Sequence, residues 1–132
     1  MTVLRPLFLY RERGYSQLDE SLPSIHDNMY FLSEELADGI LNYMKRGVVI
    51  LEFVSPVPDP LGGGDMVRNV ILSDGIYAWD GIIMNWIDRC RVKLPGEFVR
   101  HYEAVKDRDL PVSEQDAERL FDEFRSAPRV YV

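Results

Sequence analysis

The chain has 132 residues, of which 46% are hydrophobic and 28% are charged. This composition is typical of a globular protein and excludes intrinsic disorder, and the length suits one domain with a core of its own. The single cysteine, Cys90, excludes an intrachain disulfide and favours a reducing compartment. We therefore predict a single folded domain over residues 1–132.

The net charge of −7 comes from 22 acidic and 15 basic residues, and the acidic excess is spread along the chain. Because phosphate binding needs clustered lysine and arginine, we expect no nucleic-acid partner, whereas a basic protein partner is allowed. The first ten residues lack the apolar run of a signal peptide, and no window approaches the roughly 20 apolar residues of a spanning helix. These features predict a cytoplasmic protein with no membrane partner.

The first third of the chain predicts one strand, a long loop and one helix. The strand covers residues 3–10, and its proline, Pro6, favours a position at a sheet edge or an irregular start of the strand. Residues 11–31 are rich in Gly, Ser and Pro and predict the loop. The helix covers residues 33–46, with Ser33 as its N-cap and Gly47 as its stop.

The middle of the chain predicts three strands. Residues 48–54 are apolar on both faces, which favours a central strand. The Pro- and Gly-rich residues 55–65 predict a loop that joins this strand to an antiparallel partner over residues 66–72. The Asp-Gly turn at residues 73–75 then predicts a short returning strand over residues 76–79.

Three more helices are expected in the last part of the chain. The first covers residues 80–90 with Asp80 as N-cap, and the second covers residues 95–106 with a proline at its first position. The third follows Ser113 and Asp116, which resemble a capping box. A short extended segment ends the chain. Together the elements predict an α+β fold in which a small antiparallel β-sheet packs against about four α-helices.

The usual catalytic motifs are missing or incomplete. Gly62-Gly63-Gly64 is followed by Asp65, whereas a phosphate-binding loop needs lysine there, so a flexible loop is the better interpretation. Cys90 would need His26 or His101 to act as a nucleophile, but it lies on the apolar stripe of its predicted helix. A thiol in that place is typical of a core and is inert.

Metal and acid–base chemistry also lack a defined set of residues. Glu97 and His101 are four apart on a predicted helix and could face one metal, but two ligands do not make a site. Neighbouring carboxylates such as Asp74 and Asp80 more often cap turns and helices than catalyse reactions. We therefore expect no enzyme activity, no metal and no cofactor.

The aromatic residues Tyr77, Trp79 and Trp86 allow two interpretations. A tryptophan on a strand and another on the next helix can pack together beneath the sheet as part of the core. Alternatively they are partly exposed anchors for a partner, because Trp and Tyr are enriched among interface hot spots. In the second case the candidate partner-binding residues are two of these aromatics and three flanking carboxylates: Asp74, Tyr77, Trp79, Asp80 and Asp88.

A longer pattern runs through the same region. It consists of Ser73-Asp74-Gly75-Ile76-Tyr77-Ala78-Trp79, then Leu94-Pro95-Gly96-Glu97-Phe98, then His101. Residues 71–103 thereby resemble small bacterial immunity-type proteins of polymorphic toxin systems, of the contact-dependent or type VI secretion kind. The chain departs from their pattern at Met84-Asn85-Trp86, where paired tyrosines are expected.

The resemblance implies a cytoplasmic, non-catalytic protein that binds a cognate toxin and occludes its active site, and the negative charge of the chain favours a toxin with a basic cleft. The resemblance assigns no contact residue. An alternative is a small enzyme or ligand-binding domain with a pocket between sheet and helices, lined by Glu52, Arg68 and Asp74. A homodimer that pairs the strand over residues 3–10 across a two-fold axis is a third possibility.

Overall fold

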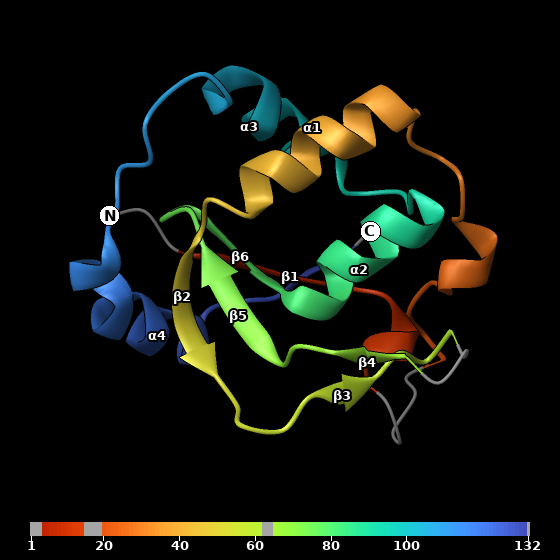
Figure 1. Ribbon diagram of the computed structural model, residues 1–132, viewed down its shortest axis with the longest axis horizontal. Coiled ribbons are helices and arrows are strands. Elements are labelled where there is room, and N and C mark those ends of the chain that lie inside the picture. Colours follow the sequence, from red (N-terminus) through yellow and green to blue (C-terminus); the bar gives the residue numbers. More distant parts are fainter. Residues whose placement is uncertain (1–3, 15–19, 62–64, 132) are drawn as a thin grey trace.

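The computed structural model describes residues 4–14, 20–61 and 65–131, and Figure 1 shows its course. These residues form an α+β fold, as predicted. The helices are α1 (Glu34–Met44), α2 (Gly81–Cys90), α3 (Gly96–Val105) and α4 (Ala117–Ser126), with 3-10 turns at Arg11–Gly14, Ile25–Asp27 and Glu114–Asp116. The strands are β1 (Arg5–Leu9), β2 (Val48–Glu52), β3 (Val57–Pro58), β4 (Met66–Val67), β5 (Val70–Ser73), β6 (Tyr77–Asp80) and β7 (Val130–Tyr131).

The main sheet is mixed, so the prediction of a purely antiparallel sheet is wrong. Its described strands follow the order β2-β5-β6-β1-β7, and β3 pairs with β4 in a separate hairpin. The strands β2, β5 and β6 are antiparallel, whereas β1 runs parallel to both β6 and β7. Parallel neighbours need long crossover connections, and the chain between β1 and β6 supplies one that contains α1.

The predicted positions of the first two strands are also wrong. β1 lies inside the sheet between β6 and β7, so it offers no free edge for a homodimer. Its proline is tolerated because Pro6 pairs with Ala78 of β6, while the pairing with β7 starts only at Leu7. β2 is an edge strand instead of a central one.

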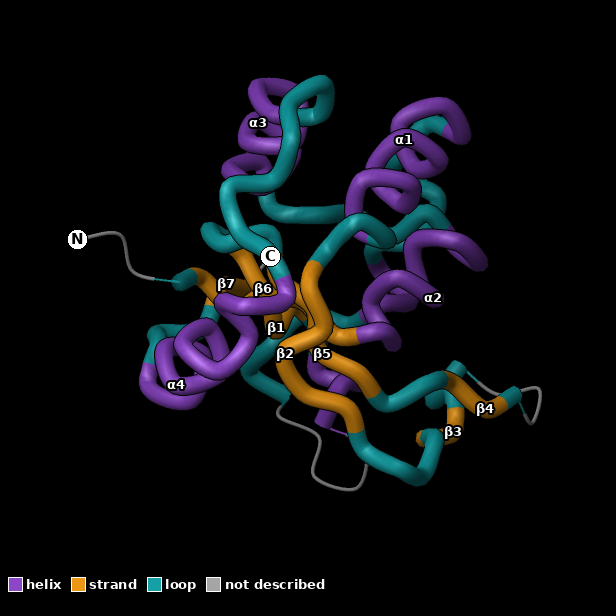
Figure 2. The backbone as a smooth tube through the Cα atoms, turned by 60° about the vertical axis from the view of Figure 1, so that its left-hand side comes forward, coloured by secondary structure: helices purple, strands orange, loops and turns teal. Residues whose placement is uncertain are grey.

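Helices lie on both faces of the sheet, and the apolar residues Val48, Ile50 and Leu51 of the edge strand β2 all pack on the α4 side, while Val49 is exposed. Figure 2 shows α1, α2 and α3 on one side of the sheet and α4 on the other. Val48 and Ile50 of β2 pack in a small cluster with Leu120 of α4. An irregular register between Val49 and Leu51 also turns Leu51 toward that cluster.

The larger core lies between the sheet and the helices α1, α2 and α3. Trp79 and Trp86 are both fully buried in it, together with Tyr10 and Phe98, so the core interpretation of the two tryptophans is confirmed. Ring pairs in edge-to-face arrangements, such as Tyr77 with Phe98 at a centroid distance of 5.1 Å, fill the space between strand and helix.

Two predicted helix caps are confirmed. The Ser33 hydroxyl accepts from the backbone N–H of Leu36 at 3.1 Å, and Asp80 Oδ1 accepts from the N–H of Ile82 at 3.1 Å. Pro95 lies at the N-cap of α3, one position before the predicted place. The described residues contain no helix with both the length and the apolar character needed to span a bilayer.

Replacement of Gly47 by alanine tests the packing between α1 and the sheet. A Cβ at Gly47 would lie 2.8 Å from Cζ2 of Trp79 and 3.1 Å from Cβ of Leu72, and neither atom can move freely. We expect Gly47→Ala to lower the free energy of unfolding by about 1–3 kcal/mol, measured by urea denaturation. Gly96→Ala is the matched control, because its Cβ would meet only the end of the exposed Arg100 side chain. Equal losses for both variants would contradict this packing.

Candidate partner-binding surface

Four of the five candidate partner-binding residues lie in the interior. Asp74, Tyr77, Trp79 and Asp80 are buried, and only Asp88 is exposed. The expectation that Trp79 is an exposed anchor with an acidic rim is therefore wrong. The physical reason is local, because a carboxylate next to a tight turn or a helix start satisfies nearby backbone N–H groups and is drawn inward.

Asp74 is the centre of a buried polar cluster. Its Oδ1 accepts from the backbone N–H groups of Ile76 at 2.9 Å and Tyr77 at 2.7 Å. Its Oδ2 accepts from the Tyr43 hydroxyl at 2.5 Å and lies 2.7 Å from Nε2 of His101. One carboxylate thus joins the β5–β6 turn to both α1 and α3. Burial and the hydrogen bond to Asp74 raise the pKa of the Tyr43 hydroxyl well above its ordinary value.

A pocket of about 260 Å³ lies beside this cluster. Tyr43, Asp74 and His101 line one part of it, and apolar side chains such as Val105 and Leu110 line much of the rest. Asp74 is therefore a lining residue, as the ligand-binding alternative expects.

The other two expected lining residues are not brought to this pocket. Arg68 donates from Nη2 to Oε1 of Glu52 at 2.8 Å, and both side chains are exposed. Glu52 and Arg68 thus form a surface ion pair between β2 and the chain after β4. A pair of this kind contributes little to stability.

The remaining candidates for chemistry are separated by the fold. Glu97 binds the guanidinium of Arg5, with Nε to Oε1 at 2.9 Å, while His101 faces Asp74, so the two do not converge on a metal. No group of three potential ligands occurs within the described part of the chain. Cys90 is buried, and burial together with the charge of Asp59 raises the pKa of its thiol. Gly62–Gly64 lie outside the described residues.

The most exposed apolar side chains of the described chain include three on one projecting segment. We call the described residues between β2 and β5, which are residues 53–61 and 65–69, the arm; it carries the β3–β4 pair seen at the bottom of Figure 1. Phe53 is 51% exposed, Met66 is 58% exposed, and Val54 is fully exposed. The arm stays ordered as an antiparallel ladder, in which Pro58 pairs with Met66.

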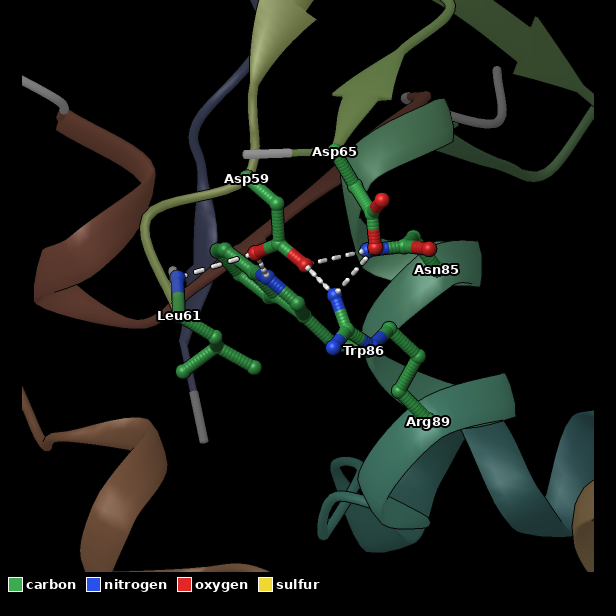
Figure 3. A network of polar contacts seen from close by, with 6 residues as sticks. All are labelled: Asp59, Leu61, Asp65, Asn85, Trp86 and Arg89. Carbon is green, nitrogen blue, oxygen red and sulfur yellow. Dashed lines mark hydrogen bonds and ion pairs between the residues drawn. The ribbon is translucent and has the colours of Figure 1, made fainter. Parts of the chain in front are cut away.

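A buried aspartate anchors the arm to α2 (Figure 3). Asp59 Oδ1 accepts from the backbone N–H of Leu61 at 2.9 Å and from Nε1 of Trp86 at 3.4 Å. Its Oδ2 accepts from Nδ2 of Asn85 at 2.9 Å and from Nη1 of Arg89 at 2.6 Å. The Asp59 side chain is fully buried, so these donors replace the water that the carboxylate loses.

The network holds both limbs of the hairpin. Arg89 Nη1 also lies 3.2 Å from Oδ2 of Asp65, across the hairpin from Asp59. The backbone N–H of Asp59 donates to the carbonyl of Asp65 at 3.0 Å. Because Asn85 and Arg89 are one helical turn apart, they present their side chains on the same face of α2. The arm is thereby fixed in a defined position relative to the body of the molecule.

Sequence reasoning missed the arm as a surface. Composition predicts only a loop over residues 55–65, since proline and glycine mark turns without stating what the turns contact. One sequence feature could have indicated it. Asn85 and Arg89 lie four residues apart and therefore on one face of a helix whose other face is apolar. A buried acceptor opposite them, between Pro58 and Pro60, is the missing partner.

Comparison of the chain with protein-family models, with curated proteins and with solved structures finds no match. The resemblance of residues 71–103 to immunity-type proteins stays a prediction. The functional conclusion therefore rests on the geometry of the chain's own residues.

Removal of the Asp59 carboxylate tests the anchor. We expect Asp59→Ala to lower the free energy of unfolding by about 2–4 kcal/mol, because Trp86 and Asn85 lose a buried hydrogen-bond acceptor. The loss is smaller than that for breaking a fully buried ion pair, because the partly exposed guanidinium of Arg89 can be hydrated. Limited proteolysis should also cut the arm faster. Asp65→Asn is the control, since its carboxylate is exposed and its contact to Arg89 is weak. An unchanged cleavage rate in Asp59→Ala would contradict the anchoring role.

Removal of one hydroxyl tests the Asp74 cluster. Tyr43→Phe takes one donor from Asp74 but leaves the two backbone N–H groups and His101. We expect a loss of about 1–2 kcal/mol in the free energy of unfolding, measured by urea denaturation. Tyr30→Phe removes the hydroxyl of an exposed tyrosine and should leave stability unchanged. If the two variants behave alike, the bond to Asp74 has no net stabilising effect.

Proposed function

We propose that this protein is a non-catalytic binding protein that neutralises a cognate bacterial toxin by covering the toxin's active site, in the manner of immunity proteins. The observation that carries the proposal is the anchored arm, which exposes Phe53, Val54 and Met66 at separate points along its length while Asp59 holds its hairpin against α2. The resemblance of residues 71–103 to immunity-type proteins points in the same direction.

The apolar side chains of the arm favour a protein partner. Burial of apolar surface contributes roughly 25 cal/mol per Å², and interface cores are enriched in aromatic residues and methionine. A flexible loop would lose much of this gain through the entropy of ordering on binding. Because the Asp59 network already orders the arm, that loss is reduced.

The charge of the chain favours a basic partner. The net charge of −7 attracts a toxin with a basic cleft and speeds their encounter, while long-range repulsion disfavours acidic proteins. Asp65 stands on the arm itself with its carboxylate largely exposed, next to Met66. We infer that the apolar contacts supply most of the affinity and that the acidic field supplies selectivity and rate.

The buried carboxylates support a binding role over a catalytic one. Asp59, Asp74 and Asp80 each accept hydrogen bonds from backbone N–H groups, and the first two also bind side chains of neighbouring helices. Their lone pairs are thus engaged in holding the fold, whereas a general base needs a lone pair that faces the substrate.

The pocket beside Asp74 supports a second candidate, a small ligand-binding domain. Its specific basis is that Tyr43, Asp74 and His101 converge from α1, the β5–β6 turn and α3 on one cavity. The arm is the stronger basis, because the hydrogen bonds of Asp74 are directed at the protein itself. A small molecule that changes the His101 resonances at micromolar concentration would favour this second candidate.

Co-expression with a toxin tests the proposed function. The protein to test as the toxin is the one encoded immediately upstream, and the readouts are survival of the cells that produce it and the dissociation constant of the purified pair. We expect rescue by the unaltered protein. Val54→Asp and Met66→Asp should each weaken binding by about 30-fold or more and abolish rescue, because they place a charge in a desolvated contact.

Tyr30→Asp and Phe31→Asp are the matched controls. Both side chains are as exposed as those of the arm but lie before α1, so the same change in charge should leave binding and rescue intact. The proposal fails if the protein does not rescue cells from the neighbouring toxin. It also fails if the arm variants and the controls weaken binding equally.

A further inference from the structure

A second cavity lies on the opposite face of the sheet from α1 and α2. It has a volume of about 310 Å³ and is bounded by β1, the end of β2, β5 and the C-terminal end of α4. Figure 2 shows α4 on this face of the sheet. Its walls are mainly aliphatic and aromatic: Leu7, Phe8, Leu51, Phe53, Ile71 and Phe124.

The only charged residues among its described lining residues are two arginines, Arg125 and Arg129. This is unusual in a chain with 22 acidic and 15 basic residues. The pocket beside Asp74, by comparison, is lined by two aspartates, one arginine and one histidine. The charge of the cavity is therefore opposite to that of the molecule as a whole.

Both guanidinium groups are available to a ligand. Arg129 stacks on the ring of Phe8, with its Cζ 4.3 Å from the ring centroid, and pairs with no carboxylate among the described residues. Arg125 lies over the ring of Phe121, with its Cζ 5.4 Å from the ring centroid, and contacts Asp122 through Nη2 to Oδ1 at 3.3 Å, but the side chains of Arg125 and Asp122 are both more than 60% exposed. An exposed pair of this kind is weak and leaves most donors of the guanidinium unused.

We propose that this cavity binds a small amphipathic carboxylate, with an unbranched apolar chain against the walls and the carboxylate at the two arginines. A guanidinium can donate two parallel hydrogen bonds to one carboxylate. Stacking on Phe8 already restricts the orientation of the Arg129 guanidinium, so less conformational entropy is lost when it binds an anion. The partial negative charge at the end of α4 opposes an anion, but two full positive charges outweigh it. The volume lies at the lower end of the range for small-molecule sites.

The inference does not depend on the proposed toxin-binding function. Phe53 lines the cavity and is also exposed on the arm, but Val54 and Met66, which test the arm, do not line the cavity. Loss of toxin rescue and loss of ligand binding can therefore be separated by different variants.

A titration of the protein with decanoate tests the site. Decanoate is kept below its micellar concentration, and binding is monitored by two-dimensional NMR of the backbone amides. Decanol and decyltrimethylammonium serve as neutral and cationic probes with the same chain. We expect decanoate to shift the amides of Leu51, Ile71 and Phe124 saturably, with decanol at least about tenfold weaker and no saturable binding of the cation.

Variants separate the role of the arginines from general stability. Arg129→Gln should weaken decanoate binding about tenfold, and the double variant with Arg125→Gln should weaken it further. Arg119→Gln on α4 is the matched control, because Arg119 pairs with Asp116 and Glu123, does not line the cavity, and its loss causes the same change in charge as the loss of either cavity arginine. Thermal melts verify that each variant folds.

Ala127→Phe provides a test that keeps both arginines. Ala127 lines the cavity, so a phenyl ring there should occupy the space of the ligand and abolish saturable shifts. If Ala127→Phe does not fold, the arginine series decides alone. Equal binding of decanol and decanoate, or unchanged decanoate affinity in the double arginine variant, would overturn the proposal. So would the absence of saturable shifts in the unaltered protein.

Discussion

A carboxylate that leaves water must find donors inside the protein, and two buried aspartates of this chain find theirs on elements that are distant in sequence. Asp74 joins the β5–β6 turn to α1 and α3 through Tyr43 and His101. Asp59 joins the arm to α2 through Asn85, Trp86 and Arg89. These two groups tie α1 and α3 to the β5–β6 turn and the arm to α2, in addition to the apolar packing of the core.

This use of aspartate divides the acidic residues into two sets with different roles. The buried carboxylates hold the fold and are unavailable to a partner, while the exposed ones give the molecule its negative field. The exposed apolar residues of the arm then stand out, because a small domain normally covers such side chains. An ordered apolar segment on an acidic body suits association with a basic protein partner.

The second face of the sheet shows a related constraint. α4 is short and covers Val48 and Ile50 through Leu120, but it leaves Leu51, Ile71 and Phe8 bordering an open cavity. The chain leaves α4 after Ser126 and turns back into β7, so that Arg125 at the end of the helix and Arg129 before β7 both line an apolar cavity.

The sequence by itself determined the features that depend on residues a few positions apart. The α+β class, the four helices, the caps at Ser33 and Asp80 and the Asp-Gly turn are local, because capping and amphipathic periodicity act within one or two turns of the chain. The tertiary structure alone decided that β1 is internal, that β2 is an edge and that Asp59 is buried. Strand order and the donors of a buried carboxylate join residues that are tens of positions apart, and no local pattern encodes which of them meet.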